Sequence, residues 1–261
     1  MSVDQVQGLQ QDQRPHGVHQ VHRVHRVHRH LRWRRDGGGA AYRTRRSFPA
    51  TPASRTVLLA GPGAVSALDG EGRDDLLLGR LTARLVASGA QVLECDMPAR
   101  DAGTPAGEPD VRARADRLRQ LLDGHRHLLT GPLVLIGFSL GGQALLRLLE
   151  SGAPARADRL VLVGTVVDDD VFLTSRVPAV ELVYGGHDLL GFVDSFDTSL
   201  PPVVFEPTVY ADWSARHLIG SPTPAVRVHV LEGLGHTLHP CGSGPARDPL
   251  AELGSLVVPA W

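Results

Sequence analysis

The stretch from Pro132 to Gly142 reads PLVLIGFSLGG, and residues 143–149 continue it as QALLRLL. The first part is an apolar run of Leu, Val and Ile, which predicts a strand buried on both faces of a sheet. Residues 143–149 predict a helix. Between them stands the motif Gly-x-Ser-x-Gly at residues 137–141. We expect this turn to hold Ser139 in a strained backbone conformation, with its hydroxyl raised above the end of the sheet.

From Thr56 onward the chain alternates between short apolar runs and amphipathic stretches. This alternation predicts an α/β fold, in which a mostly parallel sheet is flanked by helices on both faces. The expected strands are residues 56–60, 91–94, 133–136, 160–163, 180–184 and 227–231. The expected helices are residues 74–88, 110–122, 143–150 and 249–256, and Gly89 is a natural stop for the first of them.

The order strand, Gly-x-Ser-x-Gly, helix resembles the nucleophile elbow of the α/β-hydrolase family, and the resemblance covers residues 55–261. It implies that Ser139 is a nucleophile. A serine hydroxyl reacts poorly at neutral pH, so it needs a base within hydrogen-bond reach and an acid that orients this base. The family supplies these groups in the chain order Ser, Asp, His.

Two later stretches resemble the parts of the family that carry the acid and the base. Residues 180–188 read VELVYGGHD, which resembles a strand and the loop after it and makes Asp188 the acid. Residues 227–236 read RVHVLEGLGH, which resembles the last strand with its Gly-His loop and makes His236 the base. The resemblance therefore implies a catalytic triad of Ser139, Asp188 and His236.

Other side chains compete for these roles. Residues Asp168, Asp169 and Asp170 follow the preceding strand, where some hydrolases place the acid. His187 adjoins the favoured acid, and His239 precedes a proline outside the Gly-His context. His229 lies within an expected strand, where we expect it to pack in the core. We favour Asp188 and His236 because of their position after strands and their order in the chain.

The loop that would complete an oxyanion hole departs from the family pattern. One donor should be the backbone N–H of Leu140, directly after the nucleophile. The second donor normally comes from a loop after an early strand, often beginning His-Gly, but residues 59–64 read LAGPGA. Pro62 has no N–H and cannot donate. Either Gly61 or Gly63 supplies the donor, resembling the Gly-Pro-Gly loops of some family members, or the hole is weakened.

The N-terminal part of the chain differs from the rest in composition. All 27 basic residues of the 261 are Arg, and residues 1–55 carry a net charge of +8 against −9 for the remainder. Because residues 1–54 show no apolar periodicity, we expect a disordered Arg/His-rich tail ahead of a catalytic domain at residues 55–261. Five histidines recur every third residue, a spacing that could in principle present imidazoles to a transition metal or Arg side chains to phosphates, but a solvated extension is the favoured interpretation. These are His16, His19, His22, His25 and His28.

Composition and spacing also limit cofactors and location. The two cysteines are too few for a disulfide framework and wrongly spaced for a zinc site, and no apolar run is long enough to span a bilayer. We therefore expect a cytoplasmic protein with no metal, no organic cofactor, and neither nucleic acid nor membrane as a partner.

The expected partner is a small-molecule acyl substrate, a carboxylic ester or thioester that is cleaved through an acyl-enzyme intermediate. Few residues separate the strands ending at Val163 and starting at Val180, so we expect no large lid there. Five aromatic side chains after the acid could line an acyl pocket or simply pack against the sheet: Phe192, Phe196, Phe205, Tyr210 and Trp213.

Three other functions are compatible with these features. The same triad could serve a C–C hydrolase, a peptidase or a cofactor-free haloperoxidase. The unusual loop at Pro62 could mark a catalytically silent binding module. The basic tail could be the working part, with the domain as its scaffold.

Overall fold

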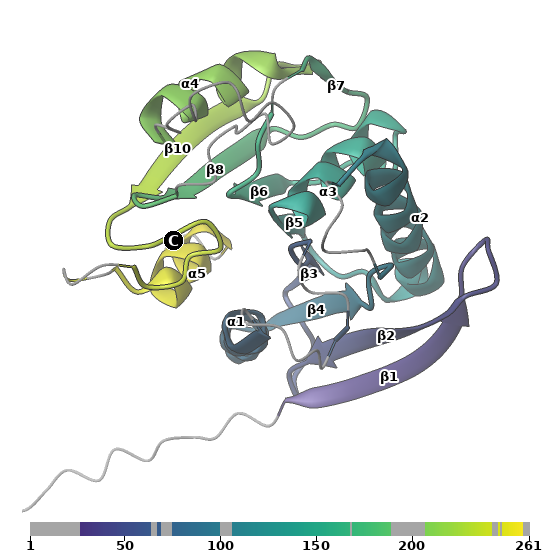
Figure 1. The fold of residues 1–261 in the computed structure, drawn as a ribbon. Coiled ribbons are helices and arrows are strands. Elements are labelled where there is room, and N and C mark those ends of the chain that lie inside the picture. Colours follow the sequence, from purple (N-terminus) through teal and green to yellow (C-terminus); the bar gives the residue numbers. More distant parts are fainter. Residues whose placement is uncertain are drawn as a thin grey trace, which may run out of the picture.

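The computed structural model describes residues 27–63, 67–68, 75–99, 106–167, 169–188, 207–241, 245 and 247–257. Its main element is an eight-stranded sheet with the order β1-β2-β4-β3-β5-β6-β8-β10 (Figure 1). The strands are β1 (His28–Arg35), β2 (Ala41–Phe48), β3 (Arg55–Ala60), β4 (Ala90–Cys95), β5 (Leu133–Phe138), β6 (Arg159–Val163), β8 (Ala179–Gly185) and β10 (Ala225–Leu231). Two short strands, β7 (Val171–Leu173) and β9 (Leu218–Gly220), pair in parallel apart from this sheet.

The six strands from β3 to β10 in the main sheet are all parallel, as the sequence predicts. Each expected strand is present, and the observed bounds extend the expected ones by at most two residues at either end. The central strands have nearly every side chain buried, because helices cover both faces of the sheet.

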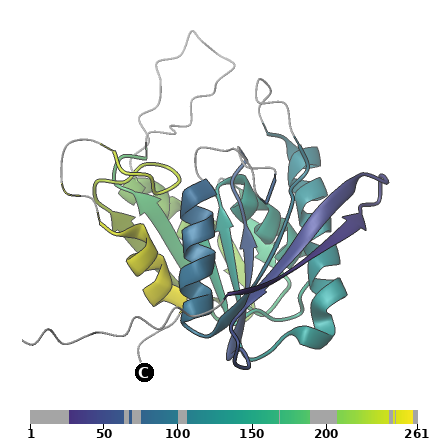
Figure 2. The same ribbon diagram turned by 90° about the horizontal axis from the view of Figure 1, so that it is seen from below.

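Leucine and valine divide between the two faces of these strands. Leu58, Leu93 and Leu135 belong to one core cluster, together with side chains of α2 (Glu108–His125), α3 (Leu140–Glu150) and α4 (Pro207–His217). The alternating valines, among them Val57, Val92 and Val134, belong to a second cluster with α1 (Asp75–Ala87) and α5 (Pro249–Val257). Figure 2 shows α1 and α5 side by side on their face of the sheet. The fold class is therefore α/β, as predicted.

The helix bounds agree with the sequence to within two residues except at three places. Helix α2 ends at His125, three residues later than expected. Helix α3 begins directly after Ser139, three residues earlier than expected. Helix α4 lies in a stretch that the sequence predicts only as an aromatic-rich connection. Gly89 ends α1 as predicted, and its φ of 88° is one that glycine adopts at low cost. Within the described residues, no helix combines the length and the apolar character needed to cross a bilayer.

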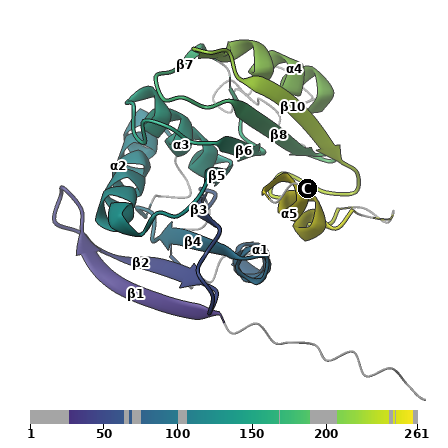
Figure 3. The ribbon, with the colours of Figure 1, turned by 180° about the vertical axis from the view of Figure 1, so that it is seen from behind.

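The prediction of a disordered tail was wrong for residues 28–48. These residues form the antiparallel hairpin β1–β2, and β2 pairs antiparallel with β4 at the edge of the sheet (Figure 3). Tyr42, Thr44 and Ser47 of β2 are buried. Much of the contact between this hairpin and the rest of the fold is polar, so the segment shows little apolar periodicity. The residues that it contacts are also distant in sequence. Residues 1–26 lie outside the described part of the chain.

Arginines of the hairpin pair with acids elsewhere in the fold. The Arg45 guanidinium contacts the Glu94 carboxylate at 3.0 Å, and Arg43 contacts Asp96 at 3.0 Å. Burial alone would raise the pKa of Asp96, but hydrogen bonds from Arg43 and the Leu68 N–H hold this pKa below its usual value. Part of the positive charge of this segment thus serves to hold the hairpin to the sheet. Arg43 and Arg45 are therefore not ligand-binding groups of a free tail.

We expect Tyr42→Ala to detach the hairpin and lower the free energy of unfolding by about 3 kcal/mol or more. The Tyr42 ring is 1% exposed, and its hydroxyl donates to Gln120 Oε1 at 2.8 Å. Urea denaturation measures the change. Trp33→Ala in the same hairpin is the matched control, because Trp33 is 68% exposed and its loss should change stability by about 0.5 kcal/mol or less. Equal effects from both variants would contradict the packing of the hairpin against α2.

Candidate active site

The turn between β5 and α3 holds Ser139 in a conformation that is unusual for a residue with a side chain. Its φ is 49° and its ψ is −119°, and φ in this range is disfavoured for any residue other than glycine. The Ser139 N–H donates to the carbonyl of Val163, the last residue of β6, at 2.8 Å. This is the strained strand-turn-helix expected from the sequence.

Close backbone contacts explain the glycines around this serine. A Cβ on Gly137 would lie 2.5 Å from the Cα of Gly142. A Cβ on Gly141 would lie 2.5 Å from the carbonyl oxygens of both Ala60 and Gly61. The second contact places the first turn of α3 directly against the loop that follows β3. Any larger residue at Gly137 or Gly141 would therefore displace backbone.

Two buried side chains, Thr165 and Tyr184, form hydrogen bonds that support the serine turn. The Thr165 hydroxyl, just beyond β6, lies 3.3 Å from the Ser139 carbonyl, and the Tyr184 hydroxyl donates to the Thr165 carbonyl at 3.1 Å. Burial raises the pKa of Tyr184 to about 12, so its hydroxyl stays protonated and able to donate. The turn is thereby connected through hydrogen bonds to β8.

Asp188 and His236 meet at the ends of β8 and β10, which are parallel neighbours. His236 Nδ1 lies 3.1 Å from both Oδ1 and Oδ2 of Asp188, whose side chain is 2% exposed. A carboxylate only accepts hydrogen bonds, so Nδ1 is the donor, and in the neutral ring Nε2 is then the free acceptor. Gly185 permits this meeting, because a Cβ there would collide with the carbonyl oxygens of Leu234 and Gly235.

The His236 ring lies against Gly164, the residue that directly follows Val163. A Cβ on Gly164 would be 2.5 Å from the His236 carbonyl oxygen and 3.0 Å from its Nδ1, and the φ of Gly164 is 53°. Val163 is also the residue whose carbonyl accepts the Ser139 N–H. The end of β6 is therefore in contact with both the serine turn and the histidine. Sequence reasoning missed Gly164, although a glycine directly after a buried strand was the available signal.

The competing acids and histidines lie in different surroundings. Asp169 and Asp170 are exposed, and Asp170 lies 4.0 Å from His217 Nε2; Asp168 lies outside the described residues. His187 and His239 are exposed as well. The expectation of a core position for His229 was wrong, because its side chain is 30% exposed and its Nε2 lies 2.9 Å from the buried Glu181 carboxylate. The strand register turns this ring toward Glu181 on β8.

The loop after β3 contains both glycines that were candidates for the second oxyanion donor. Gly61 O lies against the first turn of α3, as described above. An arginine that sequence reasoning missed contacts the same loop: Arg114 of α2 is 1% exposed, and its guanidinium lies 3.3–3.5 Å from the carbonyl oxygens of residues 61, 62 and 63. Leu140 is the first residue of α3, where backbone N–H groups have no acceptor within the helix.

The aromatic residues proposed for an acyl pocket are only partly described. Phe192, Phe196 and Phe205 lie outside the described residues, and so does the side chain of Tyr210. Trp213 is 44% exposed on α4 and stacks on His217 with ring centroids 4.5 Å apart. Trp213 therefore faces solvent and packs on its own helix.

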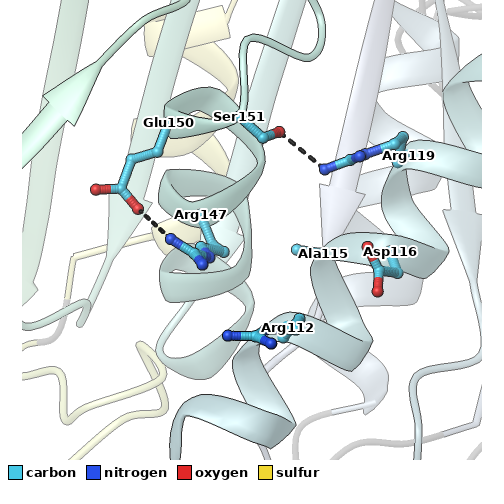
Figure 4. Close-up of a pocket in the computed structure, with 7 residues that line it drawn as sticks. All are labelled: Arg112, Ala115, Asp116, Arg119, Arg147, Glu150 and Ser151. Atoms are coloured by element: carbon cyan, nitrogen blue, oxygen red, sulfur yellow. Dashed lines mark hydrogen bonds and ion pairs between the residues drawn. The ribbon is translucent and has the colours of Figure 1, made fainter.

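A separate pocket of about 330 Å³ lies between α2 and α3 (Figure 4). Two contacts cross this lining: Arg147 lies 3.5 Å from Glu150, and Arg119 donates to Ser151 Oγ at 2.9 Å. None of its lining residues is Ser139, Asp188 or His236. Across the described part of the chain, no three His, Cys, Asp or Glu side chains gather as a metal site requires.

No protein-family model matches the sequence, and no curated protein matches it. Solved structures do match. A dienelactone hydrolase from Anabaena variabilis has a TM-score of 0.61 at 16% identity, covering 89% of this chain and 96% of its own. An α/β serine hydrolase homologue from Coxiella burnetii has a TM-score of 0.58 at 15% identity, covering 88% and 95%.

The chain has the α/β-hydrolase fold. A third match, described as an α/β serine hydrolase without lid from Xanthomonas campestris, has a TM-score of 0.54 at 16% identity and covers 88% of this chain and 91% of its own. At such identities the likeness is one of fold. The α/β-hydrolase fold explains why Ser139, Asp188 and His236, which are far apart in sequence, lie at the same end of the sheet. They follow β5, β8 and β10, which are parallel strands.

We expect Gly164→Ala to push His236 away from its position beside Asp188. The added methyl group overlaps the His236 backbone and ring, which should lower the free energy of unfolding by about 1–3 kcal/mol beyond the cost of the positive φ. Gly152→Ala is the matched control, because its φ is 75° but its Cβ would meet nothing nearer than 3.7 Å. Denaturation curves give the difference between the two variants, and a crystal structure of Gly164→Ala gives the shift of the ring. Equal destabilisation with an unmoved ring would contradict this role of Gly164.

Proposed function

We propose that this chain is a serine hydrolase that cleaves a carboxylic ester or thioester through an acyl-enzyme intermediate. Ser139 is the nucleophile, His236 the base and Asp188 the acid that orients the base. The observation that carries the proposal is the buried Asp188 carboxylate bound to His236 Nδ1 at 3.1 Å, at the same sheet edge as a serine with positive φ. Buried, oriented pairs of this kind are what a serine nucleophile requires.

The reaction balances in two steps. Ser139 Oγ attacks the substrate carbonyl carbon while its proton moves to His236 Nε2, and the imidazolium formed is stabilised by Asp188. The tetrahedral intermediate expels the alcohol or thiol, which takes the proton from Nε2. Water then attacks the acyl-enzyme, gives its proton to the same nitrogen, and releases the carboxylic acid as Ser139 recovers its proton. Backbone N–H groups beside Ser139 stabilise the oxyanion in both steps.

Two observations support an ester or thioester as the substrate class. The segment between β6 and β8, residues 164–178, contains only the short strand β7 and no large inserted lid among its described residues. The solved structures of similar fold include a dienelactone hydrolase and a serine hydrolase without lid. A site without a large lid in this segment suits a small acyl compound.

A catalytically silent binding module is the second candidate, and the proline in the loop after β3 is the observation that favours it. Pro62 removes one backbone donor from the position where the fold uses this loop. The two candidates differ in whether Ser139 is reactive, so covalent labelling separates them.

We expect Ser139→Ala to abolish hydrolysis of p-nitrophenyl acetate and labelling by a fluorophosphonate probe. The thermal midpoint should stay nearly unchanged, because only a partly exposed hydroxyl is removed. Ser255→Ala, at an exposed position of α5, is the control and should keep both activities. Wild-type protein that neither turns over esters nor takes the label would instead support the binding module.

We expect Asp188→Asn to lower kcat roughly a thousandfold or more, since an amide in place of the acid favours the wrong tautomer of the base. The control is Asp170→Asn, which changes an exposed carboxyl group of the competing acidic cluster and should leave kcat unchanged. Steady-state kinetics on the same ester measure both. If Asp170→Asn is the damaging change and Asp188→Asn is harmless, the assignment of the acid is wrong.

A further inference from the structure

Arg114 is a charged residue at a fully buried position, which calls for a physical reason. It lies on α2 with 1% exposure and is the largest of the fully buried side chains described. A buried guanidinium is costly unless its N–H groups find acceptors. Three of its acceptors are successive carbonyl oxygens of one loop, at 3.5 Å from Gly61, 3.4 Å from Pro62 and 3.3 Å from Gly63.

These contacts determine the direction of the peptide groups in the loop. In a trans peptide the C=O of one residue and the N–H of the next point in opposite directions. The Pro62 carbonyl is turned toward Arg114, so the Gly63 N–H points away from the guanidinium. The peptide between Gly61 and Pro62 is turned the same way but has no N–H to offer. The Gly63 N–H thus lies on the side of the loop opposite Arg114.

The loop also borders the nucleophile turn. The carbonyl oxygens of Ala60 and Gly61 lie where a Cβ on Gly141 would be, within 2.5 Å. A change in the direction of the loop's peptide groups would therefore move polar backbone atoms beside the first turn of α3. If the carbonyls rotated away from α2, negative oxygen ends would face the region in which an oxyanion forms.

We propose that Arg114 is a positioning residue of the oxyanion hole. Its guanidinium holds the carbonyls of residues 61–63 on the α2 side, and the Gly63 N–H, which replaces the donor lost at Pro62, is the second donor beside that of Leu140. This proposal rests on the hydrolase function proposed above. It decides between Gly61 and Gly63, and it explains how a loop with a proline can still serve catalysis.

The test compares Arg114→Met with Arg117→Met. Both arginines lie on α2 and are buried, but Arg117 holds the hairpin through Asp36 at 2.7 Å and the Asp96 carbonyl at 3.1 Å. Both variants should lose stability. Only Arg114→Met should lower kcat for p-nitrophenyl acetate, by about a hundredfold, the usual effect of losing one oxyanion donor. Its KM should change little, because the donor acts on the transition state.

A second readout separates positioning from general damage. A trifluoromethyl ketone forms a tetrahedral oxyanion on the serine, so its affinity should fall in Arg114→Met in parallel with kcat and stay unchanged in Arg117→Met. Arg114→Lys, which keeps the charge but has fewer donors, should recover part of kcat. A folded Arg114→Met protein with kcat near that of the wild type would overturn the proposal.

A further pair of variants covers the case in which Arg114→Met does not fold. Gly63→Pro deletes the N–H in question, whereas Gly63→Ala adds a side-chain carbon and keeps the N–H. We expect Gly63→Pro to lose about a hundredfold in kcat relative to Gly63→Ala. Equal kcat in the two variants would overturn the assignment of Gly63. If the wild type itself is inactive and unlabelled by fluorophosphonate, the proposed function fails, which is a different result from either of these.

Discussion

The close approach of backbone segments around the serine turn is the constraint on which the rest of the structure depends. Gly137 and Gly141 have no room for a Cβ, one against Gly142 and the other against the carbonyl groups of the β3 loop. These contacts bring the start of α3 and the end of β3 together at the end of β5. The strain of a positive φ at Ser139 is tolerated because strand and helix on either side are well packed.

The same principle recurs where Asp188 and His236 meet. Gly164 and Gly185 lie at the ends of β6 and β8, and each lets the segment around His236 come within contact of a neighbouring strand end. Hydrogen bonding then selects the orientation, since His236 Nδ1 contacts both oxygens of a nearly inaccessible carboxylate. The absence of a Cβ at Gly164 and Gly185 makes room for His236 at this end of the sheet. The contacts of its Nδ1 with Asp188 then orient the ring.

Buried charge has a different role away from this edge. Glu94 and Glu181 are buried in the sheet, Glu94 paired with Arg45 of β2 and Glu181 with Arg159 of β6 and Arg227 of β10. Glu94 joins the N-terminal hairpin to the sheet, and Glu181 joins β6, β8 and β10. Such pairs favour one arrangement of the strands, because separating the partners would leave a costly buried charge. Arg114 differs from them in that the partners described above are backbone carbonyls.

Local patterns in the sequence were sufficient for the parallel strands, for four of the five α-helices in the described part of the chain, and for the serine turn. Apolar runs and helical periodicity depend on near neighbours, and the Gly-x-Ser-x-Gly turn is encoded within a few residues. The pairing of Asp188 with His236 was expected only through a family resemblance, and the structure places those two side chains in contact. Their catalytic role stays a prediction.

Only the tertiary structure decided what depends on partners distant in the chain. The β1–β2 hairpin has polar, arginine-rich strands that bind β4 and α2, so the weak apolar pattern of residues 28–48 did not by itself predict strands. Gly164 and Arg114 owe their importance to contacts with His236 and with the β3 loop, which lie tens of residues away. Local sequence determined most of the elements because their formation depends mainly on near neighbours, whereas the site required the folded sheet because its geometry is a property of several strand ends at once.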